Sequence, residues 1–244
     1  MSEPEYVRLT PRAVVALDYP GTPAPGSGVL DGDRFWPGRE LDRLDHRTMV
    51  LAVGANASPS VLAYKLHRAG VTGAVGMVRA EVTGLAVGHS AYVSRRGYVP
   101  AGPYAADETT SVVGLWLTGE QCTAIDATEP NYDRIDLRCD DHPLRPEIGE
   151  TPTTYGVYVS HWDVLAADGL PLRLGTQREL FARLGVMPAL AALVPWDDPE
   201  AAVRALADPA TQALIRDGFV TAGWVADAAL GSADQAVDPL DRQP

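Results

Sequence analysis

The sequence predicts an α+β protein, a small and mostly antiparallel β-barrel with short flanking helices and a helical C-terminal extension. Two observations lead to this fold class. Between residues 49 and 175, short runs of β-branched and aromatic residues are broken by Gly or Pro, as in antiparallel sheets and barrels. From residue 176 onward, apolar residues recur at helical spacing. We therefore divide the chain into an N-terminal arm (1–48), a β-rich domain (49–175), and a helical extension with a tail (176–244).

The N-terminal arm contains "YPGTPAPGSGVLDGD" at residues 19–33. Pro, Gly and Asp favour turns over regular elements, so we expect a loosely organised segment here. The β-rich domain begins with "MVLAVG" (49–54), which predicts a short strand that ends at a glycine. A helix is expected next, with Ser58 as its N-cap, Pro59 at its first position and Gly70 at its end.

Four short strands are expected after this helix, in "GMVRAEV", "LAVGHSAYV", "YVPAG" and "SVVGLWL", because Gly and Pro interrupt the pattern between them. Residues 131–139 and 154–160 read as two further strands. Residues 164–174 predict a hairpin that turns at Asp168-Gly169.

In the extension, Thr176 and Glu179 form a capping box ahead of a helical run at 176–194. Residues 198–230 predict further helices with a break near Asp208-Pro209.

Composition narrows the range of partners. The 244 residues carry a formal net charge of -12, which disfavours binding to nucleic acid or to an anionic membrane. Cys122 and Cys139 are too few for a disulfide framework, and no apolar run approaches the ~18 residues of a membrane span. The polar N-terminus lacks the apolar core of a signal peptide, so we expect a cytoplasmic protein. Lys65 is the only lysine among 20 Lys and Arg residues, a bias that we attribute to a GC-rich genome.

One carboxylate, Glu129, occupies an unusual position. Thr118 and Gln121 form a capping box, which predicts a helix that begins at Gly119. Pro130 pushes Glu129 out of the helical region, so the helix should end at about Thr128. The negative end of the helix dipole disfavours a charge there by ~0.3–1 kcal/mol and favours the protonated carboxyl group. Such a group suits general acid or base catalysis. Alternatively, Glu129 is solvated or paired with a nearby arginine such as Arg134.

Three segments together resemble the γ-glutamylcyclotransferase-like family. "LWLTGEQCTAIDATEPNYDRIDL" (115–137) resembles the segment of that family that carries a Glu after a short helix. "LAVGANASPSVL" (51–62) is similar to the loop that follows a strand in the family, and "AYVSRRGYVPA" (91–101) is similar to a later strand region. The order of the three segments agrees with the family, and the resemblance covers residues 49–175.

The resemblance implies an enzyme that releases 5-oxoproline from a γ-glutamyl amine or peptide, a small-molecule substrate, without a cofactor or metal. Glu129 would be its catalytic acid and base, and Asp126 matches an Asp three residues before it. The implied substrate-binding loop consists of Val53, Gly54, Ala55, Asn56 and Ala57.

The loop departs from the family at two positions, where Val53 replaces a Tyr and Ala55 replaces a Ser. The backbone N–H groups of residues 54–57 could still bind substrate, because they do not depend on those side chains. From the residues alone, the loop also reads as an ordinary β–α turn with Asn56 in a left-handed conformation. The alternative function is a non-catalytic member of the same fold that binds a small ligand or a partner protein. A third is a related acyl- or amide-processing enzyme.

Other candidate sites are weaker. Arg95 and Arg96 could hold a substrate carboxylate or could be solvated. "RCDDH" (138–142) offers Cys139 to His142 as metal ligands, but adjacent residues at a strand end rarely converge, and a solvated turn is the simpler interpretation. Ser90 lies in "GHSAY", which lacks the last Gly of a nucleophile elbow.

Overall fold

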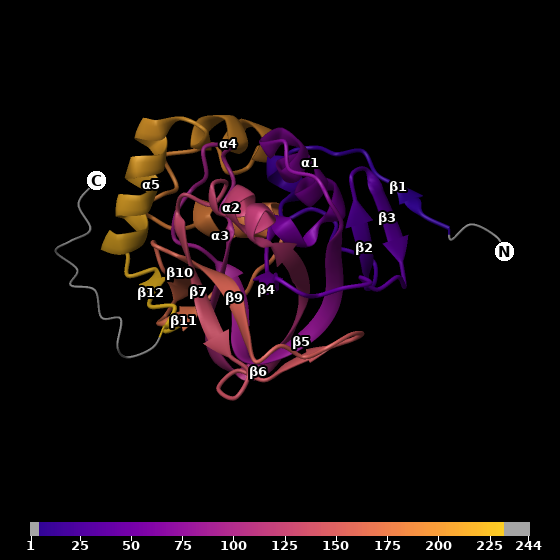
Figure 1. Cartoon of the computed structure of the whole chain (residues 1–244). Coiled ribbons are helices and arrows are strands. Elements are labelled where there is room, and N and C mark those ends of the chain that lie inside the picture. Colours follow the sequence, from indigo (N-terminus) through magenta and orange to yellow (C-terminus); the bar gives the residue numbers. More distant parts are fainter. Residues whose placement is uncertain (1–4, 232–244) are drawn as a thin grey trace.

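The computed structural model describes residues 5–231 and shows a mixed α+β protein built on one large sheet (Figure 1). The sheet has nine strands in the order β1-β3-β2-β5-β6-β4-β9-β7, with β8 on β5. The strands of this sheet are β1 (Val7–Arg8), β2 (Gly28–Asp31), β3 (Arg34–Pro37), β4 (Arg47–Ala52), β5 (Val75–His89), β6 (Ala101–Thr118), β7 (Tyr132–Arg138), β8 (Leu144–Pro146) and β9 (Thr154–Ser160).

The sheet curls but remains open. Its pairings are antiparallel except for β4 with β9, which run parallel. Within residues 5–231, the end strands β1 and β7 do not pair with each other. The expected closed barrel is therefore not confirmed, whereas the mixed α+β class and the mostly antiparallel pairing are.

The two longest strands correct the expectation of four short ones. The segments around Gly84 join into β5, and those from Ala101 to Thr118 join into β6. Gly84 has φ +85° at the point where the register shifts between Thr83 and Leu85. A glycine at a β-bulge bends a strand without ending it, which is why this Gly does not act as a strand breaker.

Two helices cover one face of the curled sheet. They are α1 (Pro59–Ala69) and α2 (Gly119–Asp126), and a short 3-10 turn, η2 (Ala55–Ala57), precedes α1. Gly70 ends α1 with φ 71°, as predicted, although the Ser58 side chain makes no capping hydrogen bond. The Thr118–Gln121 capping box is present, and α2 begins at Gly119. Cys122 and Ile125 of α2 are buried in the core between helices and sheet.

The N-terminal segment is better ordered than a loose arm. β2 pairs with β5, and β3 joins β2 to β1, so these strands extend the sheet. Leu30 and Phe35 are 1% exposed and belong to the same core as α1. Before these strands, the turn η1 (Ala16–Asp18) contacts the C-terminal helices, and Leu17 packs against their core.

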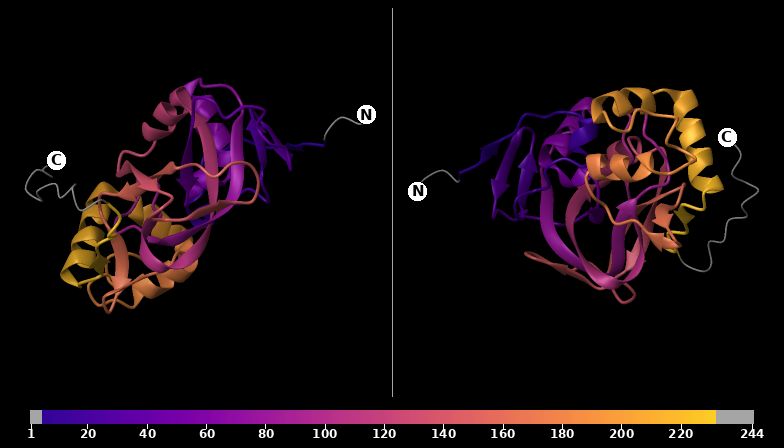
Figure 2. Two further views of the ribbon diagram at one scale, coloured as in Figure 1. Left: turned by 60° about the horizontal axis from the view of Figure 1, so that its bottom comes forward. Right: turned by 180° about the vertical axis from the view of Figure 1, so that it is seen from behind.

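The C-terminal extension packs through a second core against the loop between β5 and β6 and against the hairpin at 164–174. The β10–β11 hairpin turns at Asp168-Gly169 as predicted, and β12 pairs with β10. The helix expected at 176–194 ends earlier, at Gly185, and the predicted break at Asp208 separates the last two helices. The N-terminal strands and this extension lie at opposite ends of the sheet (Figure 2). The elements of the hairpin and of the extension are β10 (Val164–Ala167), β11 (Leu170–Pro171), α3 (Gln177–Gly185), α4 (Pro199–Leu206), α5 (Pro209–Thr221) and β12 (Val225–Ala226).

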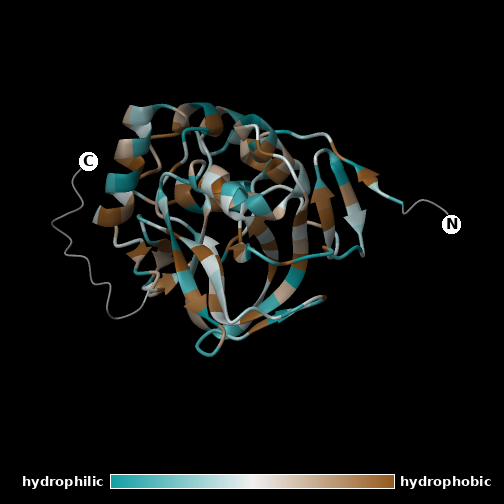
Figure 3. Ribbon diagram, in the orientation of Figure 1, coloured by the Kyte–Doolittle hydropathy of each residue, from teal (hydrophilic) through white to brown (hydrophobic). Residues whose placement is uncertain are grey.

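The buried side chain of Gln177 ties the extension to the loop between β5 and β6. Its amide accepts from the Val99 N–H and donates to the Val99 carbonyl, both at 2.8 Å. Hydrophobic residues follow the inner strands and the inward helix faces, and polar residues gather at the lower tips of the long strands (Figure 3). No helix among residues 5–231 has the length and apolarity needed to cross a bilayer. The expected tail beyond residue 231 lies outside the described residues.

Candidate functional site

A cavity of about 740 Å³ lies where the sheet, helix α1, the turn after α2 and the extension meet. The loop after β4, the turn after α2, the loop at 92–96 and one face of α5 all contribute to its wall. Residues Ala13, Val14 and Tyr19 of the N-terminal segment complete it. The three parts into which we divide the sequence therefore share one cavity.

Glu129 lines this cavity on a fixed turn. Its N–H donates to the Asp126 carbonyl at 3.0 Å, and its own carbonyl accepts from the Tyr132 N–H at 3.0 Å. Helix α2 ends at Asp126, and residues 127 and 128 form a turn, two residues earlier than predicted. The backbone at Glu129 thus leaves the helix ahead of Pro130, as the sequence predicts.

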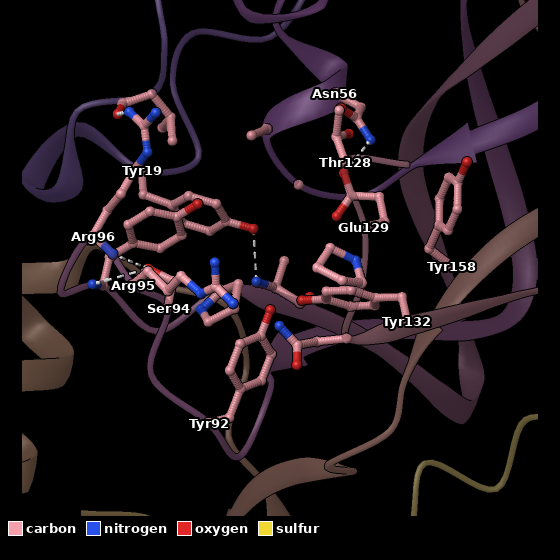
Figure 4. A pocket seen from close by; sticks show the side chains of 18 of the residues that line it. Tyr19, Asn56, Tyr92, Ser94, Arg95, Arg96, Thr128, Glu129, Tyr132 and Tyr158 are labelled. Atoms are coloured by element: carbon pink, nitrogen blue, oxygen red, sulfur yellow. Dashed lines mark hydrogen bonds between the residues drawn. The ribbon is translucent and has the colours of Figure 1, made fainter. Parts of the chain in front are cut away.

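The Glu129 carboxylate is held by two side chains. Oε1 accepts from Lys65 Nζ at 2.6 Å and from Asn56 Nδ2 at 3.0 Å (Figure 4). Lys65 also donates to Asn56 Oδ1 at 2.7 Å, which closes a ring of three groups. The Lys65 and Glu129 side chains are only 17% and 18% exposed. Glu129 is therefore neither solvated nor paired with Arg134, and its partner is the single lysine of the chain.

The second carboxyl oxygen of Glu129 is differently placed. Oε2 accepts no hydrogen bond from any residue that the structure describes. One oxygen is thus anchored by the protein, while the other can accept a proton from a bound ligand.

Asp126 has a structural role instead. Its carboxylate accepts both a bidentate pair from Arg134, at 3.0 and 3.2 Å, and the Tyr158 hydroxyl at 2.6 Å. Burial raises the pKa of Asp126, but the hydrogen bonds from Arg134 and Tyr158 outweigh it and hold that pKa below its usual value. Asp126 does not line the cavity, and it ties the end of α2 to β7 and β9.

Four of the five predicted loop residues, from Val53 to Asn56, line the cavity. Ala57 does not, and its N–H donates to the Gly54 carbonyl at 2.9 Å. The N–H groups of Ala55 and Asn56 have no acceptor among the described residues, so they can bind a ligand. Asn56 does not adopt the left-handed conformation that an ordinary turn would require.

Gly54 is required by a close approach. A Cβ atom at this position would lie 2.5 Å from Tyr19 Oη and 3.3 Å from the Ala101 Cβ. A side chain at residue 54 would therefore displace Tyr19, which also lines the cavity.

Tyrosine hydroxyls supply much of the polar lining, since six tyrosines line the cavity. Tyr19 Oη accepts from the Ala101 N–H at 2.7 Å, and Tyr132 Oη donates to the Ala101 carbonyl at 2.8 Å. The Tyr19 ring stacks on Tyr98 with centroids 4.4 Å apart. Burial raises the pKa of five of the six phenols, so these five remain neutral hydrogen-bonding groups. They are Tyr19, Tyr92, Tyr98, Tyr132 and Tyr158.

The remaining candidate site residues from the sequence differ in whether they line the cavity. Arg95 and Arg96 line the cavity, on the side away from Asn56 and Glu129 in Figure 4. Ser90 is buried outside the cavity, and its Oγ lies 2.5 Å from Ser160 Oγ. In the 138–142 segment, Arg138 pairs with the exposed Asp140 at 3.0 Å. Within residues 5–231, no group of three His, Cys, Asp or Glu side chains converges as a metal site.

Sequence reasoning missed Lys65, the tyrosines and the face of α5. Lys65 carries a signal, since it is the only lysine of the chain. The tyrosines carry none, because they come from separate segments that only the fold brings together. Comparison with family models, with curated proteins and with solved structures gave no match.

Proposed function

We propose that the chain is a γ-glutamylcyclotransferase-like enzyme, which releases 5-oxoproline from a γ-glutamyl amine or peptide. One observation carries the proposal: Glu129 lines the same cavity as Ala55 and Asn56, whose backbone N–H groups have no acceptor among the described residues. A general acid and base therefore lies within the reach of one small ligand from donors that can hold an oxyanion. We also propose that the curled open sheet is a distorted form of the family's barrel.

The proposed reaction needs no nucleophile from the protein. Glu129 Oε2 takes a proton from the α-ammonium of the substrate, and the free amine attacks the γ-carbonyl carbon. The new C–N bond gives a tetrahedral oxyanion, which the loop N–H groups stabilise. The bond to the leaving amine then breaks as Glu129 returns its proton to that nitrogen. The regenerated carboxylate takes the second proton from the ring nitrogen and passes it to the released amine. The products are 5-oxoproline and an ammonium ion, which accounts for both protons lost by the α-ammonium.

Lys65 and Asn56 prepare Glu129 for this role. The Lys65 ammonium, 2.6 Å from Oε1, places a positive charge beside the carboxylate, near the negative end of the α2 dipole. Because both partners bind Oε1, they also fix the direction in which Oε2 points. A positioned carboxylate of this kind can accelerate proton transfer by about 10²–10⁴-fold.

The missing Tyr and Ser hydroxyls of the loop have substitutes in the cavity. Tyr92 lies across the cavity from Asn56 in Figure 4, and Tyr98 also lines the cavity. These neutral phenols can hydrogen-bond the substrate without competing for its proton.

The test is a 5-oxoproline assay on a panel of γ-glutamyl amines and peptides, with the full chain and with Glu129→Gln. We expect turnover that falls by about 10²–10⁴-fold in the variant. Glu120→Gln is the matched control, because Glu120 is exposed on α2, the helix that precedes Glu129, and does not line the cavity. Equal turnover in wild type and Glu129→Gln would remove Glu129 from the mechanism.

The second candidate function is a non-catalytic binding protein with the same cavity. It is favoured by the two hydrogen bonds that Glu129 Oε1 already accepts within the protein. In that case, calorimetry would detect binding of a γ-glutamyl compound, no 5-oxoproline would form, and Glu129→Gln would change affinity alone.

A further inference from the structure

The charge of the cavity is opposite in sign to that of the chain. Among the side chains that line it, four are cationic and only Glu129 is acidic, in a protein whose net charge is -12. Lys65 and Glu129 pair with each other, so the remaining cations are not neutralised by that carboxylate. They are Arg95, Arg96 and Arg216, which we call the arginine end of the cavity.

These three guanidiniums have no carboxylate partner among the described residues. Arg95 makes no hydrogen bond or ion pair there at all. Arg96 donates to the Val14 carbonyl at 3.4 Å, and Arg216 lies 4.8 Å from the centre of the Trp162 ring. Contacts of this kind orient a guanidinium and leave its charge uncompensated.

The arginine end is assembled from distant parts of the chain. Arg95 and Arg96 lie on the loop that follows β5, whereas Arg216 lies on α5 of the C-terminal extension. Gln212 of α5 also lines the cavity and donates to the Ser94 carbonyl at 3.1 Å, so helix and loop are joined directly. An anion in this space would therefore be attracted by three cationic side chains.

We propose that the arginine end is an anion-binding subsite, which takes a carboxylate or phosphate group of the ligand other than the group that reacts near Glu129. Guanidinium suits both anions, because its planar donors match their oxygens in bidentate geometry. The inference deepens the proposed function by assigning an acidic leaving group to the substrate. It rests on that function only for the choice of γ-glutamyl probes.

A matched pair of probes isolates the acidic group. γ-Glutamylglycine and γ-glutamylethylamide differ only in a carboxylate in place of a methyl group, and a γ-glutamyl aminomethylphosphonate provides the phosphate-like arm. Binding is measured by calorimetry on the full chain with the Glu129→Gln substitution, which prevents turnover. We expect γ-glutamylglycine to bind about tenfold more tightly than the ethylamide, or about 1.4 kcal/mol. The relative affinity of the phosphonate shows which acid the subsite prefers.

Variants locate the effect. Arg95→Met and Arg216→Met should each reduce the preference for γ-glutamylglycine while leaving the ethylamide affinity unchanged. Arg204→Met is the control, since Arg204 is exposed on the adjacent α4 and does not line the cavity. The preference should also weaken in high salt. Equal affinities for the two probes, or a preference that survives both substitutions, would overturn the subsite.

A readout without γ-glutamyl compounds separates this proposal from the proposed function. Glutarate and inorganic phosphate are titrated into the wild-type chain and into Arg95→Met. Binding that is lost in the variant supports the subsite even if no 5-oxoproline is ever formed. If neither the γ-glutamyl probes nor these anions bind, the subsite is refuted.

Discussion

At the Glu129 end of the cavity, the acid and the lysine are paired within the protein, whereas at the arginine end three guanidiniums lack a carboxylate partner among the described residues. The Glu129 end is built by the sheet and its flanking helices, and the arginine end depends on the extension. A charge that is paired in advance is positioned for chemistry, because it needs no rearrangement when substrate arrives. A charge left unpaired is available to the ligand. Under the proposed function, catalysis therefore belongs to the Glu129 end and ligand recognition to the arginine end.

The largest effect is expected at Lys65, where a substitution tests whether the two ends of the cavity differ in role. In Lys65→Met, Glu129 loses its partner, so we expect kcat for 5-oxoproline formation to fall by about 30-fold. Lys65→Arg should retain more activity, because it keeps a positive charge. In contrast, Arg95→Met should raise KM for γ-glutamylglycine with little change in kcat. If Lys65→Met and Arg95→Met both alter KM alone, the two ends do not differ in role.

Lys65 also shows what the sequence could and could not reveal. The turn at Glu129 was predictable because its signals are local: a capping box at Thr118 and a proline at 130. The partner of Glu129 lies 64 residues away, on the face of another helix, where a lysine normally reads as solvated. Its rarity in the chain was the only signal, and we attributed that to base composition.

The features of the fold also fall into those with local sequence signals and those that depend on tertiary contacts. Gly70 and Asp208 marked helix ends correctly, because each acts through its own backbone or side chain. Gly84 was misread as a strand break, since a glycine in a bulge and a glycine in a turn look alike in sequence. The tyrosine wall and the contribution of α5 depend on tertiary contacts that no local pattern encodes.

We expect the stability of the fold to depend on pH through a buried histidine that precedes the loop carrying Arg95 and Arg96. His89, at the end of β5, is 2% exposed, and its Nε2 accepts from the Gly175 N–H at 3.1 Å. Burial lowers the pKa of His89 to about 4, below the ~6.5 of an unfolded histidine. Between these values the unfolded chain binds a proton that the folded chain does not, so stability falls as pH falls.

At pH 5.5 we expect the His89 contribution to reduce the free energy of unfolding by about 1.4 kcal/mol relative to pH 8. Urea unfolding at the two pH values measures it. His89→Gln should lose this part of the difference, whereas His67→Gln, at an exposed position on α1, should keep it. An unchanged difference in His89→Gln would show that the group does not stay neutral in the fold.

Two nearby carboxylates, Asp126 and Glu129, can be compared to separate a structural role from the proposed catalytic one. Asp126→Asn breaks the pair with Arg134, and we expect a loss of about 1 kcal/mol of stability at neutral pH, since the side chain is partly exposed. That contribution is fully present above the usual Asp pKa, because the folded pKa is lowered, and it is lost in stronger acid. Glu129→Gln should change the stability less and the turnover far more. Urea midpoints and 5-oxoproline rates on both variants test this.

The smallest effect is expected at the loop. Ala55→Ser places a hydroxyl where the proposed family has one, on a cavity-lining loop whose Ala55 and Asn56 N–H groups have no acceptor among the described residues. Because those donors belong to the main chain, the substitution should change kcat/KM by about threefold or less. A gain of a hundredfold would mean that the backbone alone does not stabilise the oxyanion, and that the Glu129 end of this chain is incomplete. The paired charges would then mark a binding site whose catalytic loop lacks a necessary group, and the division between the two ends would fail.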